Sequence, residues 1–301
     1  IDIATDAEPE RVMELAKAKG IKAIPTGITH GTVTLVAGGI PHEVTTFRRD
    51  VETDGRRAVV AFSTDIKEDA ARRDFTMNAL YARPDGSVLD PIGGLADLNA
   101  RRVRFIGDAE ARIHEDYLRS LRFFRFHAWY GDPSEGMNAD GIAAIAANLD
   151  GMAHVSVERI GAEMLKLLAA RDPAPAVAGM RSTGLLARIL PGADDRALAP
   201  LVALEASAGV ASEPIRRLAA LGGQQVLRLS KAQLSRLERL RKAVGDMAGA
   251  AELGYRLGLE EARDVLLLRG SMAAQPWREA DEKQALIGAS AKFPVAARDL
   301  M

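Results

Sequence analysis

Two clusters of charged residues have the types and spacing for chemistry on phosphates and bases. The first is the stretch HEDYLRSLRFFRF at 114–126, where Glu115 and Asp116 precede three regularly spaced arginines. These arginines are Arg119, Arg122 and Arg125. Because residues three and four apart share one face of a helix, we expect one helix here that carries acids and arginines side by side.

The second cluster interrupts the stretch EDAARRDFTMNAL at 68–80, which otherwise has helical character. Its polar residues are Arg72, Arg73, Asp74 and Asn78. Two adjacent arginines can hold triphosphate oxygens, since a guanidinium makes forked contacts with phosphate. Asp and Asn can bind ribose hydroxyls. The alternative is a solvated helix face with local ion pairs.

Two further carboxylates lie on segments with strand character. Asp2 belongs to the opening segment, and Glu43 lies in HEVTTF at 42–47. Nucleotidyl transfer needs carboxylates that converge on two Mg²⁺ ions, and acids on adjacent strands of one sheet can supply them. The alternative is that each is an exposed strand charge.

Composition excludes several classes of protein. Among 301 residues there is no cysteine, which excludes disulfides, thiolate metal sites and cysteine catalysis. The net charge of −1 provides no overall basic field, so a polyanion would have to be held by a local patch. No apolar run approaches the roughly 18 residues that span a bilayer. We expect a cytoplasmic protein that binds no membrane.

The pattern of residues predicts an α+β head followed by a helical remainder. Short β-branched runs predict strands at 32–37, 42–47, 57–62 and 102–106. Pro9 suits a first helical turn and Gly20 a helix end. After 106, Leu, Ala and Arg recur with helical period, which predicts nine or ten short helices. Prolines separate them at Pro173, Pro191, Pro214, Pro276 and Pro294.

The motifs in combination resemble those of class II tRNA nucleotidyltransferases, the CCA-adding enzymes of the polymerase-β nucleotidyltransferase superfamily. The matching segments, in order, are IDIATDAEPE, HGTVTLV, HEVTTFRRD, DGRR, RRDFTMNAL, DPIGGLADL, RVRFIGD and RIHEDYLRSLRFFRF. VSVERIGAEMLKLL at 155–168 resembles a later motif of that family, with Glu158 and Arg159 in its ERI core. The resemblance covers residues 1–170, and beyond them only the helical character is shared.

The resemblance implies that Asp116 and Arg119 read the incoming base, with Glu115 in support. Cytosine and adenine both present an amino donor beside a ring-nitrogen acceptor, which suit Asp and Arg respectively. Uracil and guanine would leave buried groups unpaired, which is costly. Arg122 and Arg125, one and two turns further, would hold phosphates.

The resemblance also assigns roles to the other polar residues. Glu43 occupies the family's third-carboxylate position, and Asp2 ends its Asp-x-Asp metal motif. Arg73, with Arg72 beside it, matches the triphosphate-binding arginine. Asp74 and Asn78 match the ribose-recognition motif. The first Asp and the phosphate loop would precede Ile1, so we expect a chain that lacks residues at both ends and does not catalyse alone.

These implications define the expected protein. A nucleotidyltransferase head with a small sheet and helices at 1–100, a neck with the nucleotide-recognition motif at 101–170, and a helical body and tail at 171–301 would together bind tRNA. The reaction would add CMP and AMP from CTP and ATP to the tRNA 3′ end, with two Mg²⁺ ions. The acceptor arm would lie along the helical part, with 230–243 as a candidate basic face, and DNA is not expected to bind.

Three alternatives remain at this point. Bacterial poly(A) polymerases share most motifs but carry a basic signature before the third carboxylate, where this chain has TGITHGTVTLV at 26–36. Enzymes restricted to CC addition lack part of the loop after that carboxylate, whereas 48–62 is complete, which favours CCA or A-only addition. A noncatalytic RNA-binding relative is the alternative from another class.

Overall fold

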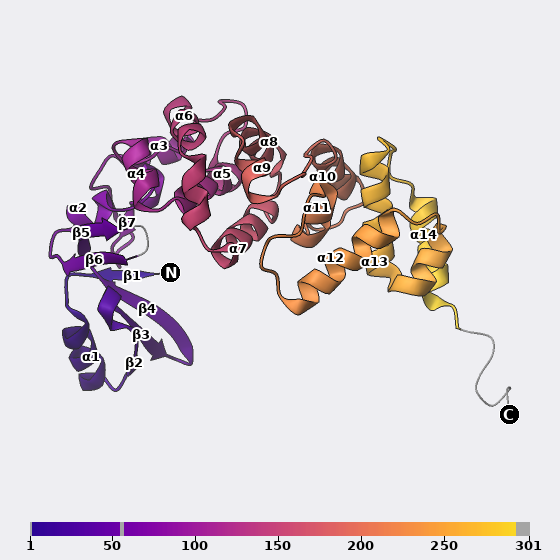
Figure 1. The fold of residues 1–301 in the computed structure, drawn as a ribbon. Coiled ribbons are helices and arrows are strands. Elements are labelled where there is room, and N and C mark those ends of the chain that lie inside the picture. Colours follow the sequence, from indigo (N-terminus) through magenta and orange to yellow (C-terminus); the bar gives the residue numbers. More distant parts are fainter. Residues whose placement is uncertain (1, 55–56, 293–301) are drawn as a thin grey trace. The chain divides into compact units, whose positions relative to one another are not determined.

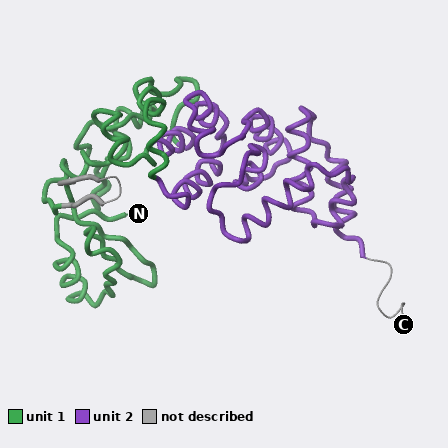
Figure 2. The backbone as a smooth tube through the Cα atoms, viewed as in Figure 1, with its two compact units in different colours: residues 1–119, 130–154 green, residues 120–129, 155–301 purple. Residues whose placement is uncertain are grey.

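The computed structural model describes residues 2–54 and 57–292, with the side chains of 50–60 left out. It forms two compact units (Figure 2). Unit 1 holds residues 1–119 and 130–154, and unit 2 holds 120–129 and 155–301. The predicted division into head, neck, body and tail stays a prediction. In the described part of the chain, no helix is both long and apolar enough to cross a membrane.

Unit 1 begins with a four-stranded sheet of order β1-β4-β3-β2 (Figure 1). Its strands are β1 (Ile3–Thr5), β2 (Lys22–Gly27), β3 (Thr32–Ala37) and β4 (Ile40–Thr46). β1 runs parallel to β4, and the other neighbours are antiparallel. Helix α1 (Pro9–Ala18) covers one face, where Val12 packs against Val33 and Val44. The predicted roles of Pro9 and Gly20 are confirmed, since α1 begins at Pro9 and Gly20 follows its end with φ 68°.

Two smaller strand pairs follow the sheet. β5 (Arg48–Asp54) pairs with β6 (Arg57–Phe62), and β7 (Tyr81–Ala82) pairs with β8 (Val88–Leu89). The strands predicted at 32–37 and 57–62 are confirmed, and the one at 42–47 begins earlier than expected. The strand predicted at 102–106 is wrong, because there only Phe105 makes a bridge, to Phe75.

The segment between these strands is held by a close backbone contact. Helix α2 (Ile66–Ala71) ends early, and a 3₁₀ turn η2 (Thr76–Asn78) follows in place of a continued helix. A Cβ on Gly94, in helix α3 (Gly94–Asn99), would lie 2.0 Å from the Thr76 carbonyl oxygen. The second glycine of DPIGGLADL therefore lets α3 pack against η2.

The single helix expected across 114–126 is wrong. Helix α4 (Ala109–Glu115) ends before Asp116, and α5 (Leu118–Tyr130) begins two residues later. Asp116 is extended, with φ −158° and ψ 104°. Its carboxylate accepts a hydrogen bond from the Leu118 N–H at 3.2 Å, and its carbonyl accepts one from the Arg119 N–H at 2.9 Å. Asp side chains favour such local bonds over a helix interior, which explains the break.

Helices make up the rest of the described chain. In unit 1 these are α6 (Ala139–Ala147) and the 3₁₀ segment η3 (Leu149–His154). In unit 2, α5 is followed by α7 (Val157–Leu168), α8 (Ala174–Thr183), α9 (Leu185–Ile189), α10 (Leu198–Ser207), α11 (Pro214–Leu221), α12 (Lys231–Val244), α13 (Ala250–Met272) and α14 (Glu279–Ser290). After 106 the described residues thus form eleven α-helices, slightly more than predicted. Pro173, Pro191, Pro214 and Pro276 lie at helix boundaries as expected, and Pro294 lies outside the described residues.

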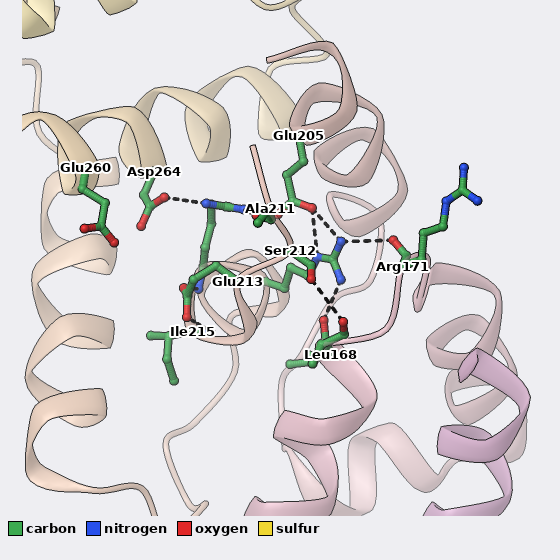
Figure 3. A network of polar contacts seen from close by, with 12 residues as sticks. Leu168, Arg171, Glu205, Ala211, Ser212, Glu213, Ile215, Glu260 and Asp264 are labelled. Carbon is green, nitrogen blue, oxygen red and sulfur yellow. Dashed lines mark hydrogen bonds and ion pairs between the residues drawn. The ribbon is translucent and has the colours of Figure 1, made fainter. Parts of the chain in front are cut away.

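A network of buried ion pairs joins helices of unit 2 (Figure 3). Adjacent arginines of α11 share Glu205 of α10, with Arg216 at 2.7 Å from one carboxylate oxygen and Arg217 at 2.7 Å from the other. Arg216 also binds Asp264 of α13 at 2.6 Å. All four side chains are at most 4% exposed, so each charge depends on its partners.

The same network also binds backbone carbonyls at and just after the end of α7. Arg217 donates to the carbonyl oxygens of Leu168 at 2.6 Å and of Arg171 at 3.2 Å (Figure 3). Carbonyls at the end of a helix have no partner within the helix, and a cation is favourable there. From α12, Arg236 reaches Asp264 at 2.7 Å. One set of charges therefore joins α7, α10, α11, α12 and α13.

We expect Glu205→Gln to destabilise unit 2 by about 3–5 kcal/mol, the usual cost of leaving a buried partner charge unpaired. The substitution keeps the shape of the side chain and removes the charge that both arginines share. Urea unfolding followed by tryptophan fluorescence measures this, because Trp129 and Trp277 both belong to unit 2.

Asp194→Asn is the matched control. Hydrogen bonds from Arg196 lower the pKa of Asp194 to about 2, yet the pair is exposed, and solvent screens such pairs strongly. We expect no measurable change in the urea midpoint for this variant. Equal loss in the two variants would contradict a special role for the buried network.

Candidate functional site

The two metal-type carboxylates lie on neighbouring parallel strands. In the register of the sheet, Ile3 of β1 is paired with Val44 of β4. Asp2 and Glu43 each come one residue earlier, so the same register sets them beside one another. Side chains alternate along a strand, and Val44 packs toward α1, so Glu43 faces the opposite side of the sheet. Both acids are exposed.

This pair fits a divalent cation of the Mg²⁺ type. Mg²⁺ takes oxygen ligands and is usually bound by one or two carboxylates together with substrate phosphates and water. Among the described side chains, no group of three or more acids or histidines is placed to hold a metal.

A buried acid that sequence reasoning missed organises the arginine pair after α2. Asp69 is 4% exposed and accepts hydrogen bonds from Arg73 at 3.3 Å, from the Tyr81 hydroxyl at 2.6 Å and from the Arg48 N–H at 3.3 Å. Arg72 lies 3.9 Å from the same carboxylate. An acid four residues before Arg73 was the available signal, because such pairs meet on a helix.

Arg73 is held as an oriented cation. Its guanidinium lies 4.9 Å from the centre of the Tyr81 ring, in a cation–π contact, and also donates to the Asn78 carbonyl at 3.4 Å. Its side chain is 33% exposed, so it remains open to an anion on one side. Burial raises the pKa of the Tyr81 phenol, and the hydrogen bond to Asp69 raises it further.

The residues predicted to recognise ribose are brought together by η2. Asp74 is buried, and its carboxylate accepts from the Asn78 amide at 2.9 Å and from the Phe75 N–H at 3.0 Å. The backbone N–H of Asn78 bonds to the Phe75 carbonyl at 2.9 Å. The tight turn thus fixes both side chains as one unit, and their ribose role stays a prediction.

The predicted base-reading arginine is fixed by three groups of unit 1. Arg119 forms an ion pair with Glu115 and donates to the Arg112 carbonyl at 3.0 Å. It also donates to the Arg72 carbonyl at 3.1 Å, which joins the 114–126 motif to the 68–80 motif. Its side chain is only 13% exposed, so its orientation is set before any ligand binds.

Arg122 and Arg125 belong to unit 2 and contact a different acid. Glu163 of α7, 4% exposed, forms an ion pair with Arg125 and lies 3.9 Å from Arg122. The Phe126 ring lies 4.5 Å from the Arg125 guanidinium and 5.5 Å from that of Arg122. The phosphate role predicted for these arginines stays a prediction.

The segment 155–168 was singled out from the sequence, but Glu163 within it was not selected. Glu158 and Arg159, chosen from the sequence, lie in the first turn of α7, where Glu158 is exposed. Glu163 lies among the buried Ile160, Met164 and Leu167. An acid on the apolar side of an amphipathic helix was the signal that pointed to it.

The arginines of the candidate tRNA-binding segment 230–243 make contacts inside unit 2. Arg236 binds Asp264, Arg239 donates to Glu261 at 2.9 Å, and Arg241 donates to the Gly222 carbonyl at 2.6 Å. These contacts favour the structural interpretation of α12. The loop at 48–62, whose completeness favours addition of the terminal AMP, includes residues 55–56, which lie outside the described residues. Its role stays a prediction.

Comparison with known proteins assigns the family. The Poly A polymerase head domain model matches residues 1–104, and the model described as the probable RNA and SrmB-binding site of polymerase A matches 139–196. A CCA-adding enzyme of Bacillus stearothermophilus, solved in complex with CTP, superposes with a TM-score of 0.80 at 31% identity. The alignment covers 99% of this chain and 76% of that one. The chain belongs to the family of CCA-adding enzymes.

Other members of the CCA-adding family agree over part of their length. The mouse CCA tRNA nucleotidyltransferase 1, mitochondrial, is 44% identical over 169 residues, which is 56% of this chain and 39% of that protein. The CCA-adding enzyme of Geobacillus thermodenitrificans is 42% identical over 194 residues, 64% and 46% respectively. The chain thus spans less than half the length of these curated relatives. The predicted family and α+β fold class are confirmed. Localisation stays a prediction, since the name of the mouse relative places that protein in mitochondria.

We expect Asp69→Asn to lower the pKa of Tyr81 toward the ordinary value of about 10, because the substitution removes a carboxylate that stabilises the neutral phenol. Absorbance near 295 nm as a function of pH measures tyrosine ionisation. Comparison with Tyr81→Phe isolates the contribution of Tyr81. An unchanged titration in Asp69→Asn would mean that burial alone raises this pKa.

Proposed function

We propose that this CCA-adding family member transfers CMP and AMP from CTP and ATP to the 3′ end of tRNA without a nucleic-acid template. The observation that carries the proposal is the fixed position of Arg119. Its guanidinium joins Glu115 in the α4–α5 region to the Arg72 carbonyl in the nucleotide-binding segment. A donor held in this way can recognise a base with little further ordering, which is what selection by protein side chains requires.

Asp116 and Arg119 together select the base under this proposal. Asp116 accepts from the exocyclic amino group of cytosine or adenine, and Arg119 donates to the adjacent ring nitrogen. Uracil and guanine present a carbonyl and an N–H in those places, so both contacts fail. A buried group left without its partner is penalised strongly, which rejects UTP and GTP.

Under this proposal, the α2–η2 segment binds the triphosphate and the ribose of the incoming nucleotide. Arg73, oriented by Asp69 and Tyr81, contacts phosphate through its open side, with Arg72 adjacent. Asp74 and Asn78 bind the ribose hydroxyls. Asp2 and Glu43 would hold divalent metal, Mg²⁺ by their chemistry, which activates the attacking 3′ hydroxyl and neutralises the leaving pyrophosphate. Arg122 and Arg125 are proposed to contact phosphate.

The acceptor arm of tRNA is the proposed partner of the helical part. Solved members of this fold include the Thermotoga maritima CCA-adding enzyme complexed with tRNA, which shares the fold at a TM-score of 0.68 and 16% identity. Contacts to phosphate and sugar position an RNA without reading its sequence, which suits an enzyme that acts on every tRNA.

Poly(A) polymerase activity is the second candidate, because the family model that matches residues 1–104 is described as a Poly A polymerase head domain. The test supplies the protein in its natural length with tRNA transcripts that lack three, two or one terminal nucleotides, and with each nucleoside triphosphate separately. The proposal requires CMP on the first two transcripts and AMP on the third. Addition of AMP to all three would favour poly(A) polymerase, and AMP on the third alone would indicate an A-adding enzyme.

We expect Glu43→Ala to lower transfer by several orders of magnitude while tRNA binding stays within a few fold. The substitution removes a metal carboxylate on the sheet and no RNA contact. Primer extension gives the rate, and gel shift gives the tRNA affinity. Activity within a few fold of wild type would remove Glu43 from the metal site.

We expect Asp116→Ala to relax base choice as well as slow the reaction. A hydrogen bond to a charged group is worth about 1.5–3 kcal/mol, so the preference for CTP over UTP and for ATP over GTP should fall about ten- to a hundredfold. The measurement is kcat/KM for all four nucleotides. Arg122→Ala is the control, because loss of a phosphate contact weakens all four alike. A parallel decrease of all four values in Asp116→Ala would place base choice elsewhere.

A further inference from the structure

The break between α4 and α5 determines where Asp116 points. Only Asp116 and Tyr117 lie between the two helices, and Asp116 is extended. In a continuous helix the Asp116 carboxylate would lie along the helix surface. Because Asp116 is extended, its carboxylate instead lies at the start of α5 and accepts a hydrogen bond from the Leu118 N–H. The hydrogen bonds that Asp116 accepts from Leu118 and Arg119 form this break, and the packing of the neighbouring Tyr117 side chain can hold it in one geometry.

The Tyr117 ring lies directly against the backbone of η3. A Cβ built on Gly151 would come 1.9 Å from the Tyr117 Cε1 atom and 2.0 Å from Cδ1, far inside contact distance. Gly151 is not among the glycines with positive φ, so its backbone conformation is open to other residues. The ring, and not backbone strain, is therefore what requires glycine at 151.

Two exposed histidine rings lie near the Tyr117 ring. The rings of His114 in α4 and His154 in η3 lie with their centres 5.8 and 6.1 Å from that of Tyr117. His114 is itself fixed by a bond of 2.7 Å between its Nε2 and the Asn148 side-chain oxygen. Tyr117, which is partly exposed, thus contacts groups from α4 and η3, all within unit 1.

We propose that the packing of Tyr117 on Gly151 is a specificity-determining contact, which rests on the proposed function of Asp116 and Arg119. The contact fixes Tyr117 and thereby the position of the adjacent Asp116 carboxylate. In that position the carboxylate can accept from the exocyclic amino group of a base while Arg119 donates to the neighbouring ring nitrogen. Hydrogen bonds weaken steeply with distance and angle, so a displacement of under 1 Å changes which base edges are accepted. Tyr117 is a positioning residue and touches no substrate.

Gly151→Ala is the first test variant. The added methyl group displaces the ring, and we expect the ratio of kcat/KM for CTP to that for UTP to fall about tenfold or more, with a similar fall for ATP over GTP. Tyr117→Ala removes the ring and should lower the same ratios. Tyr117→Phe keeps the ring and should keep them. Gly245→Ala is the control, because a Cβ there meets only the Lys242 carbonyl, at 3.8 Å.

The double variant Gly151→Ala/Tyr117→Ala separates the contact from its surroundings. With the ring gone, the methyl group no longer meets its three nearest atoms, which all belong to Tyr117, so the double variant should have the selectivity of Tyr117→Ala alone. Independent effects, with the double variant worse than either, would overturn the proposal. A decrease of all four kcat/KM values with unchanged ratios would do the same, since it would show a purely structural role.

Two further outcomes are also decisive. If Gly151→Ala does not fold, the comparison of Tyr117→Phe with Tyr117→Ala carries the test: selectivity lost only in the alanine variant supports the contact, and selectivity kept in both overturns it. If wild-type protein shows no preference for CTP and ATP, the proposed function itself fails. That result is read from the wild type alone, so the two failures are distinguishable.

Discussion

Carboxylates that orient arginines are the interaction on which this structure depends. Asp69 holds Arg73, Glu115 holds Arg119, Glu163 holds Arg125, and Glu205 is shared by Arg216 and Arg217. Removing charges from water is costly, so such pairs need not add net stability compared with apolar residues. What they provide is direction, because a planar guanidinium bound on one side presents its remaining donors along a defined line.

These ion pairs differ in how much of the arginine side chain is exposed to solvent. Arg216 and Arg217 are almost fully enclosed, and their donors go to protein groups that join α11 to α7, α10 and α13. Arg73 keeps about a third of its side chain exposed, with its guanidinium over the Tyr81 ring. One kind of interaction therefore forms an internal scaffold in unit 2 and holds a partly exposed cation in unit 1. Burial, and not residue type, separates the two uses.

The sequence allowed the sheet hairpin, the proline boundaries and the family to be predicted, because each depends on residues close together in the chain. The break at Asp116 was missed, because helical spacing continues through it and the local bond to Leu118 is a weak signal. The strand predicted at 102–106 failed since only Phe105 finds a partner. Asp69 and Glu163 escaped notice because their importance comes from burial against distant segments, which periodicity alone does not reveal.

The 41 acidic residues offset the 40 Lys and Arg residues in net charge, and internal pairing also neutralises arginines locally. On α12, a helix rich in arginine, Arg236 and Arg239 meet acids of α13, and Arg241 caps the end of α11. Arginines neutralised in this way contribute little long-range attraction to a polyanion, since an opposite charge lies within a few ångströms and screening removes the remainder. Affinity for a polyanion would then come from short-range contacts at particular phosphates.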